Sequence, residues 1–234
     1  RRGIFRRGFV EYAHLHLQEF LSYRRELLAL EPVRDVRFTG FYRAKPELVA
    51  MVARCRELRF LDSVRLHHQG PHKSPDDRAV QLLESPHFTQ LKSLYTTWCG
   101  FSEEGTERFK ALPFLKELTT LELPVVHYGD FGSSDHRLAL EKSASLVREW
   151  KCLKKFLCYQ ELSSAEWMLV ARTAGWRSLS WLRLSRAWQT LTDTEFEELL
   201  PLSLKEVTVE QEENSRALHR LLERLSQCSL GALT

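Results

Sequence analysis

The sequence predicts an α/β fold in which short parallel strands alternate with helices in a right-handed repeat array. A six-residue phrase of the form apolar-x-x-apolar-x-small/apolar occurs seven times, and its start-to-start steps are 28, 30, 27, 35, 26 and 25 residues. A recurring phrase at near-constant spacing indicates one supersecondary unit stacked on copies of itself. The copies are VRDVRF at Val33, LDSVRL at Leu61, LKSLYT at Leu91, LTTLEL at Leu118, LKKFLC at Leu153, LSWLRL at Leu179 and LKEVTV at Leu204.

Each phrase is short, alternates apolar positions and favours β-branched or aromatic residues, which is typical of a strand. The stretches between phrases carry helix-start signals. Ser102 precedes two glutamates, and Ser74 precedes Pro75 and two aspartates. The tetrads that begin at Ser163 and Thr192 fit the capping box. Parallel strands lie about 4.8 Å apart, whereas packed helices need about 8–10 Å, so the array should curve with its strands on the concave side.

The repeats and their N-terminal cap are predicted to form one continuous domain. Residues 1–32 would be the cap, with a degenerate strand at 10–15 and a helix at 18–29, because an open end of a repeat array exposes core. Residues 33–234 would hold about seven repeats, including helices at 46–53, 137–150 and 214–225. The longest step contains an insertion from His127 to His136.

The repeated phrase resembles the leucine-rich repeat, L-x-x-L-x-L-x-x-N/C-x-L, and with intervening helices it is most similar to the ribonuclease-inhibitor-like subclass. The resemblance covers about 200 of the 234 residues and implies a curved solenoid that binds other proteins. The family's Asn or Cys ladder residue is mostly absent. The corresponding positions hold Phe41, Gln69, Cys99, Val126, Glu161, Ala187 and Glu212.

The N-terminal segment also resembles a narrower bacterial group. The opening from Arg6 to Glu11 and the segment from Ala29 to Arg34 are similar to planctomycete-type proteins in which a short repeat-companion segment precedes such repeats. The helix ends at 83–88 and 111–115 resemble that group as well.

Alternation along each strand predicts which side chains form the concave surface. The fourth and sixth residues of a phrase should face the core, and the third and fifth should face solvent. Arg, Tyr and Trp often anchor protein interfaces, so this face is our candidate partner-binding surface. The residues expected to contact a protein partner are Arg37, Arg65, His67, Tyr95, Trp98, Glu122, Tyr159, Trp181 and Arg183.

Three other clusters could carry chemistry, although a structural role without chemistry is the simpler interpretation of each. The first groups His67, His68 and His72 with Asp76 and Asp77, whose residue types suit a metal but whose spacing matches no closed site, so we expect a polar loop. The second is the 127–136 insertion, whose histidines and aspartates could support acid–base or metal-dependent activity. The third is the set Arg1, Arg2, Arg6 and Arg7, which could contact phosphates.

Composition and motif searches narrow the functional class. The sequence contains no phosphate-loop, dinucleotide-binding, nucleophile-elbow or H-E-x-x-H motif, so we expect a non-enzymatic protein without a cofactor or structural metal. Net charge is only +3, although residues 1–60 carry +6 and residues 191–234 carry −5. We expect a protein partner, rather than nucleic acid, a small molecule or a membrane.

The cysteines indicate where in the cell the protein is expected, and the first residue raises the question whether the chain belongs to a longer protein. Five widely spaced cysteines without a C-x-x-C pair favour reduced thiols, and therefore a cytoplasmic location. No apolar run approaches a membrane span and no signal peptide is visible. Because the sequence begins with Arg1, a scaffolding segment of a longer multidomain protein is an alternative to a free-standing module.

Overall fold

In the computed structural model, the described residues are 2–6, 9–30, 33–67, 77–96, 101–122, 152–157, 165, 169, 172, 181–184, 206–209 and 232–233. These residues divide into two compact units. Unit 1 holds the described residues up to Leu118, and unit 2 holds those from Thr119 onward.

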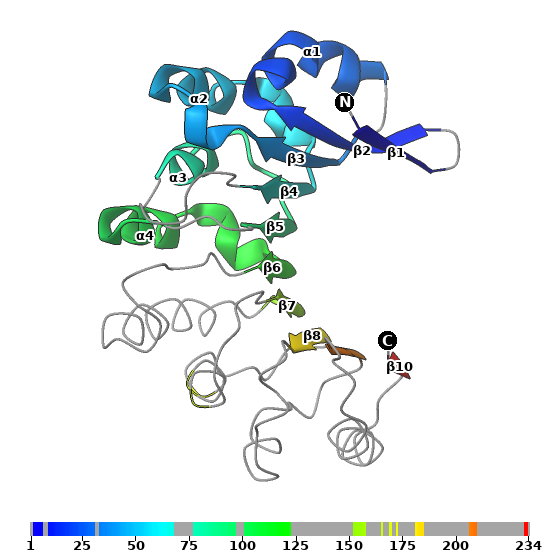
Figure 1. The fold of residues 1–234 in the computed structure, drawn as a ribbon, viewed down its shortest axis with the longest axis vertical. Helices are drawn as coiled ribbons and strands as arrows, with labels where there is room; N and C mark the ends of the chain where they lie inside the picture. The colour runs from blue at the N-terminus through cyan, green and yellow to red at the C-terminus, as the bar shows by residue number, and fades with distance from the viewer. Residues whose placement is uncertain are drawn as a thin grey trace. The chain divides into compact units, whose positions relative to one another are not determined.

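Unit 1 combines a five-stranded sheet with helices. Strands β2 to β5 pair in parallel in chain order, and β1 pairs with β2 in antiparallel orientation. Helices α2, α3 and α4 follow one another along one side of strands β3 to β5 (Figure 1). The elements are β1 Arg2–Arg6, β2 Phe9–His16, α1 Leu17–Leu30, β3 Asp35–Thr39, the 3-10 helix η1 Phe41–Arg43, α2 Pro46–Ala53, η2 Arg56–Phe60, β4 Ser63–Leu66, α3 Arg78–Leu83, β5 Ser93–Tyr95, α4 Glu103–Lys110 and η3 Pro113–Glu117.

Unit 2 contains a second run of parallel strands. Neighbouring strands pair in chain order from β6 to β10. The strands are β6 Thr120–Glu122, β7 Lys155–Leu157, β8 Trp181–Leu184, β9 Glu206–Val209 and β10 Ala232–Leu233. All seven copies of the repeated phrase therefore contain a strand, as the alternation predicts, and each strand begins at the third residue of its phrase.

The core of unit 1 lies between the strands and the helices. Val36 and Phe38 of β3, Val64 and Leu66 of β4, and Leu94 of β5 are fully buried, which confirms the predicted core face of these strands. The helices contribute fully buried side chains as well, among them Val49, Val52, Val80, Leu82 and Phe109. Burial of such side chains contributes about 1.5–3 kcal/mol each, and this apolar layer stabilises the alternating strand–helix arrangement.

A main-chain hydrogen-bond pattern repeats ahead of the strands. The carbonyl of the second residue in a phrase accepts hydrogen bonds from two consecutive N–H groups of the next phrase, which satisfies groups that would otherwise be orphaned. In unit 1, Arg34 O accepts from Asp62 N at 2.9 Å and Ser63 N at 3.0 Å, and Asp62 O accepts from Lys92 N at 2.8 Å and Ser93 N at 3.0 Å. In unit 2, Thr119 O accepts from Lys154 N at 2.8 Å and Lys155 N at 2.9 Å.

Side chains also join consecutive helical segments of unit 1. Arg78 Nη1 on α3 donates to Ala44 O before α2 at 2.9 Å. Ser85 Oγ after α3 donates to Ala53 O at the end of α2 at 2.5 Å. Arg108 on α4 pairs with Glu84 through two hydrogen bonds, of which Nε to Oε1 measures 2.7 Å. Each polar link crosses from one repeat to the next, so it helps to fix the spacing of the helices.

Two predicted helix starts have different outcomes. Ser102 caps α4 as expected, because its Oγ accepts a hydrogen bond from Gly105 N at 2.9 Å. The sequence predicts that the preceding helix begins at Pro75, with Ser74 as its N-cap. Within the described residues this prediction is wrong, because Asp77 is the N-cap residue and α3 begins at Arg78. The Asp77 carboxylate makes no capping bond to α3 and instead binds Ser102.

The N-terminal cap is more extensive than the sequence predicts. The degenerate strand and its helix are present as β2 and α1, but β1 precedes them and pairs with β2 with a register shift between Ile4 and Phe5. At the first ladder position, Phe41 is buried and begins η1. Gly40 precedes it with φ of 85°, a conformation that favours glycine.

Several predicted segments lie outside the described residues. They include the helices at 137–150 and 214–225, the insertion from His127 to His136, the capping boxes at Ser163 and Thr192, and the six remaining ladder positions. Among the helices that are described, none is long and apolar enough to cross a bilayer.

Candidate functional site

The candidate site is the face of strands β2 to β5 that alternates with the buried core positions, and we call it the open face. Strand pairing arranges its side chains in two rows. One row is Tyr12, Asp35, Ser63 and Ser93, and the other is His14, Arg37, Arg65 and Tyr95. All eight side chains are partly buried rather than fully exposed, so the rows form a packed polar surface.

Arg65 lies at the centre of the open face and binds Asp35 on the neighbouring strand. Arg65 Nε lies 3.2 Å from both carboxylate oxygens, and Nη2 lies 3.0 Å from Oδ2. The Arg65 side chain is 39% exposed and that of Asp35 is 25% exposed, so water screens the pair and its net contribution is about 0.5–1 kcal/mol. The main effect of the pair is to hold the guanidinium in one orientation.

Two tyrosines flank the same guanidinium. Arg65 Cζ lies 4.2 Å from the centre of the Tyr95 ring and 5.7 Å from the centre of the Tyr12 ring. Partial burial opposes the charged form of Arg65. The hydrogen bond to Asp35 and its charge, with the nearby tyrosines, outweigh that effect and raise the pKa of Arg65 above its ordinary value. The result is a permanently charged group fixed between two aromatic rings.

Arg37 differs from Arg65 although the two occupy paired positions on β3 and β4. Its side chain is partly buried, and within the described ranges no hydrogen bond or ion pair engages its guanidinium. Asp35 is the only carboxylate that alternation places on the open face of strands β2 to β5, and Arg65 binds both of its oxygens. The open face therefore carries one uncompensated guanidinium beside a compensated one.

A third row follows at the ends of the strands and is less open, since Thr39 is only 1% exposed. His16 pairs in register with Thr39, and Thr39 Oγ1 lies 3.3 Å from His16 Nδ1. His67 follows β4 directly, its N–H donates to Phe38 O at 3.1 Å, and its side chain is partly buried. Imidazole groups thus lie at the end of the surface that bears the two arginines.

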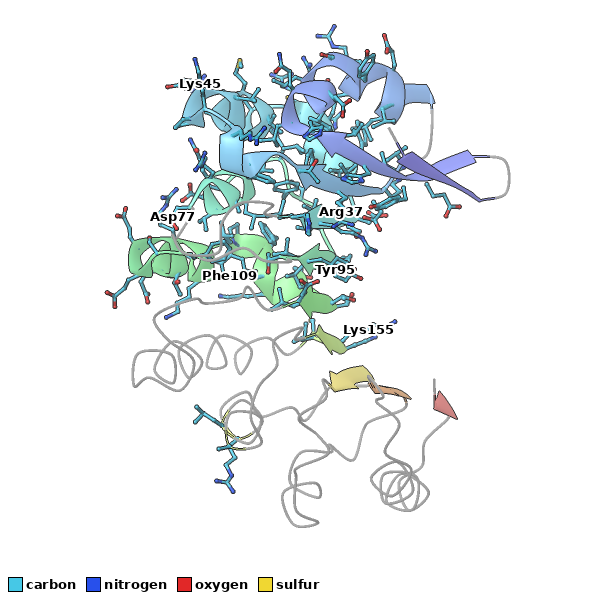
Figure 2. All side chains as sticks on the ribbon, viewed as in Figure 1. Arg37, Lys45, Asp77, Tyr95, Phe109 and Lys155 are labelled. Atoms are coloured by element: carbon cyan, nitrogen blue, oxygen red, sulfur yellow. The ribbon has the colours of Figure 1, made fainter. Side chains whose placement is uncertain are left out.

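The structure brings together four of the nine nominated residues in unit 1. Arg37, Arg65 and Tyr95 share one row, and His67 lies at the end of β4. Figure 2 shows Arg37 and Tyr95 on the strand side of unit 1, whereas Asp77 and Phe109 lie on its helix side.

The remaining nominated residues belong to unit 2 or lie outside the described residues. Trp181 and Arg183 belong to β8 and pair in register with Glu206 and Thr208 of β9. Trp98 and Tyr159 lie outside the described residues.

The prediction that Glu122 faces solvent is wrong. Glu122 of β6 is only 3% exposed, and Thr120 of the same strand is 6% exposed. Alternation assigns a side chain to one face of a strand, but it does not determine what packs against that face. A buried carboxylate is costly to desolvate, so Glu122 is unsuited to an accessible contact with a partner.

Tyr12 and His14 were not among the residues predicted to contact a partner. Both lie on β2, the degenerate strand that precedes the first phrase, and they extend the two rows of the open face by one strand. The signal was present, because the strand at 10–15 was predicted and its alternation places residues 12 and 14 opposite the buried Ala13 and Leu15.

Asp77 belongs to the histidine–aspartate cluster for which the sequence predicts a polar loop, and its carboxylate is engaged by Ser102. Asp77 Oδ1 accepts a hydrogen bond from Ser102 N at 2.9 Å, and Oδ2 accepts from Ser102 Oγ. His68, His72 and Asp76 lie outside the described residues. No group of three or more histidine, cysteine or acidic side chains in the described ranges could hold a metal ion. The 127–136 insertion and Arg1 and Arg7 also lie outside the described residues.

Comparison with known proteins does not assign a function to this site. Neither a scan against protein-family models nor a search of the curated proteins finds a match to the chain. The open face therefore has to be interpreted from its own residues.

Proposed function

We propose that this chain is a non-catalytic recognition module of the leucine-rich-repeat type, which binds a protein partner through the open face of strands β2 to β5. In this proposal the repeats form a right-handed solenoid and the open face is its concave surface. The alternative in which the chain scaffolds a longer protein uses the same surface. The free thiols of Cys55 and Cys152 suit the reducing compartment in which we place the protein.

The observation that carries the proposal is the fixed geometry around Arg65. The bidentate contact with Asp35 and the stacking on Tyr95 hold an arginine and an aromatic ring in place before any partner arrives. Arginine and tyrosine are enriched among the residues that dominate binding energy, and preorganisation lowers the entropy lost on association. A parallel sheet also supplies a rigid base for these side chains.

Affinity capture with matched variants tests the proposal. The open-face variant carries Arg65→Ala and Tyr95→Ala. The control carries Met51→Ala and Arg54→Ala, which change exposed residues at the end of α2. We expect proteins retained by the unmodified chain and by the control to be lost from the open-face variant. Recovery of the same proteins with all three baits would contradict recognition through the open face.

A further inference from the structure

We propose that the open face binds an acidic segment of its protein partner, and that Arg37 makes the central contact with an Asp or Glu carboxylate of that segment. This inference rests on the proposed recognition function and adds the chemistry of the partner. It starts from the difference between two arginines at paired positions of β3 and β4.

The open face carries two neighbouring arginines but only one carboxylate within strands β2 to β5. Paired residues on neighbouring parallel strands lie about 4.8 Å apart, so the side chains of Arg37 and Arg65 occupy adjacent positions. Like charges on adjacent side chains repel each other. Asp35 balances one of them, because Arg65 engages both of its oxygens. One positive charge is left over within the described rows, and it is the charge of Arg37.

The Arg37 guanidinium is incompletely hydrated. Arg37 is partly buried, and its guanidinium forms no hydrogen bond or ion pair with any residue that the structure describes. A guanidinium in such surroundings loses part of its hydration without receiving a compensating partner. An incoming carboxylate would supply that partner through two parallel N–H···O hydrogen bonds, which is the geometry for which arginine is suited.

The neighbours of Arg37 on the open face also suit an acidic segment. His14 and Arg65 lie on either side of it in the same row, and Arg65 adds a second guanidinium beside that of Arg37. Tyr95 and Tyr12 provide apolar ring surface beside Arg65. An acidic segment that lies along this row would meet donors at successive strands and aromatic surface near them. The charge complementarity therefore favours a peptide that bears carboxylates over a basic or neutral one.

A binding assay with a labelled glutamate-rich peptide and a glutamine-rich peptide of the same length tests the proposal. We expect the glutamate peptide to bind, the glutamine peptide to bind much more weakly, and Arg37→Ala to reduce the affinity for the glutamate peptide about tenfold or more. Arg54→Ala is the matched control, because it removes the same charge from an exposed arginine at the end of α2. We expect that control to retain the affinity within about twofold, because an isolated exposed charge contributes little.

Several outcomes would overturn the acidic-segment proposal. Equal binding of the two peptides, equal losses in the Arg37 and Arg54 variants, or tighter binding of a single-stranded RNA than of the glutamate peptide would each do so. Self-association that Arg37→Ala abolishes would assign the surface to another copy of this chain and would also overturn it. If lysate capture depends on Arg65 and Tyr95 but not on Arg37, the recognition function stands and only the acidic-segment proposal fails.

Discussion

The Asp77 carboxylate binds both the backbone N–H and the hydroxyl of Ser102, and it thereby ties the turn before α3 to the start of α4. The Ser102 hydroxyl also accepts from Gly105 N at 2.9 Å, so one side chain caps its own helix and contacts the preceding repeat. This link is polar and joins residues 25 positions apart in the sequence.

Ser102→Ala is expected to destabilise the protein by about 1–2 kcal/mol, because it removes an N-cap and leaves the Asp77 carboxylate with one fewer donor. Urea unfolding followed by circular dichroism measures the change. The control is Ser93→Ala on the open face, where we expect a change within about 0.5 kcal/mol. Equal effects of the two substitutions would contradict the structural role of Ser102.

Gly105→Ala is expected to destabilise the chain because the added Cβ would clash with the Asp77 carboxylate. The same substitution should be favourable when Asp77 is first changed to Ala. Alanine is better than glycine within a helix by about 0.5–1 kcal/mol, and the clashing atoms are then absent. A double-mutant cycle measured by urea unfolding gives the coupling. An effect of Gly105→Ala that is identical in both backgrounds would disprove this close contact.

Leu94→Ala and Tyr95→Ala on β5 test the assignment of the two faces of the sheet. Leu94 is fully buried, so its truncation should cost about 2–5 kcal/mol. Tyr95 is partly exposed on the open face, so Tyr95→Ala should cost about 1 kcal/mol or less. Thermal or urea unfolding of the two variants provides the measurement. A larger loss for Tyr95→Ala would mean that the core and open faces are reversed.

Cys55 should make stability fall at alkaline pH. Burial raises the pKa of its thiol, an effect that the charge of Arg24 reduces and that of Glu57 reinforces. The folded state therefore favours the protonated thiol. This contribution to stability is fully present below the unfolded pKa, about 8.5, and is lost as pH rises through the folded value.

Urea unfolding at neutral and alkaline pH measures the Cys55 contribution. We expect the loss of stability with rising pH to be smaller in Cys55→Ala than in the unmodified protein. Cys152→Ala, at an exposed thiol, is the control substitution. A pH dependence that is the same in all three proteins would remove Cys55 as its source.

Sequence periodicity predicted the strands better than it predicted the helix starts. The repeated phrase locates the seven strands β3 to β9 and identifies the core residues of β3, β4 and β5, because alternation is a local property of the chain. The start of α3 was placed too early. Asp77 looked like a first-turn acid in the sequence, but its carboxylate binds Ser102 in the next repeat, and such a tertiary contact has no local signature.

The candidate site could be predicted only in part. Arg37, Arg65 and Tyr95 were found because strand alternation and repeat register follow from the phrase itself. Their different partners were not predicted, since Asp35 bonds to Arg65 on the neighbouring strand rather than to Arg37 two residues along its own. Glu122 was misassigned because alternation determines the face of a strand but not how deeply that face is buried.

Site-specific photo-cross-linking determines whether a captured protein lies against the open face. A photoreactive phenylalanine analogue replaces Ser93, which lies beside Tyr95 on β5, and in a second protein it replaces the exposed Met51 on α2. If the partner binds the open face, we expect cross-links to a captured protein from position 93 and none from position 51. Cross-links from position 51 alone would contradict recognition through the open face.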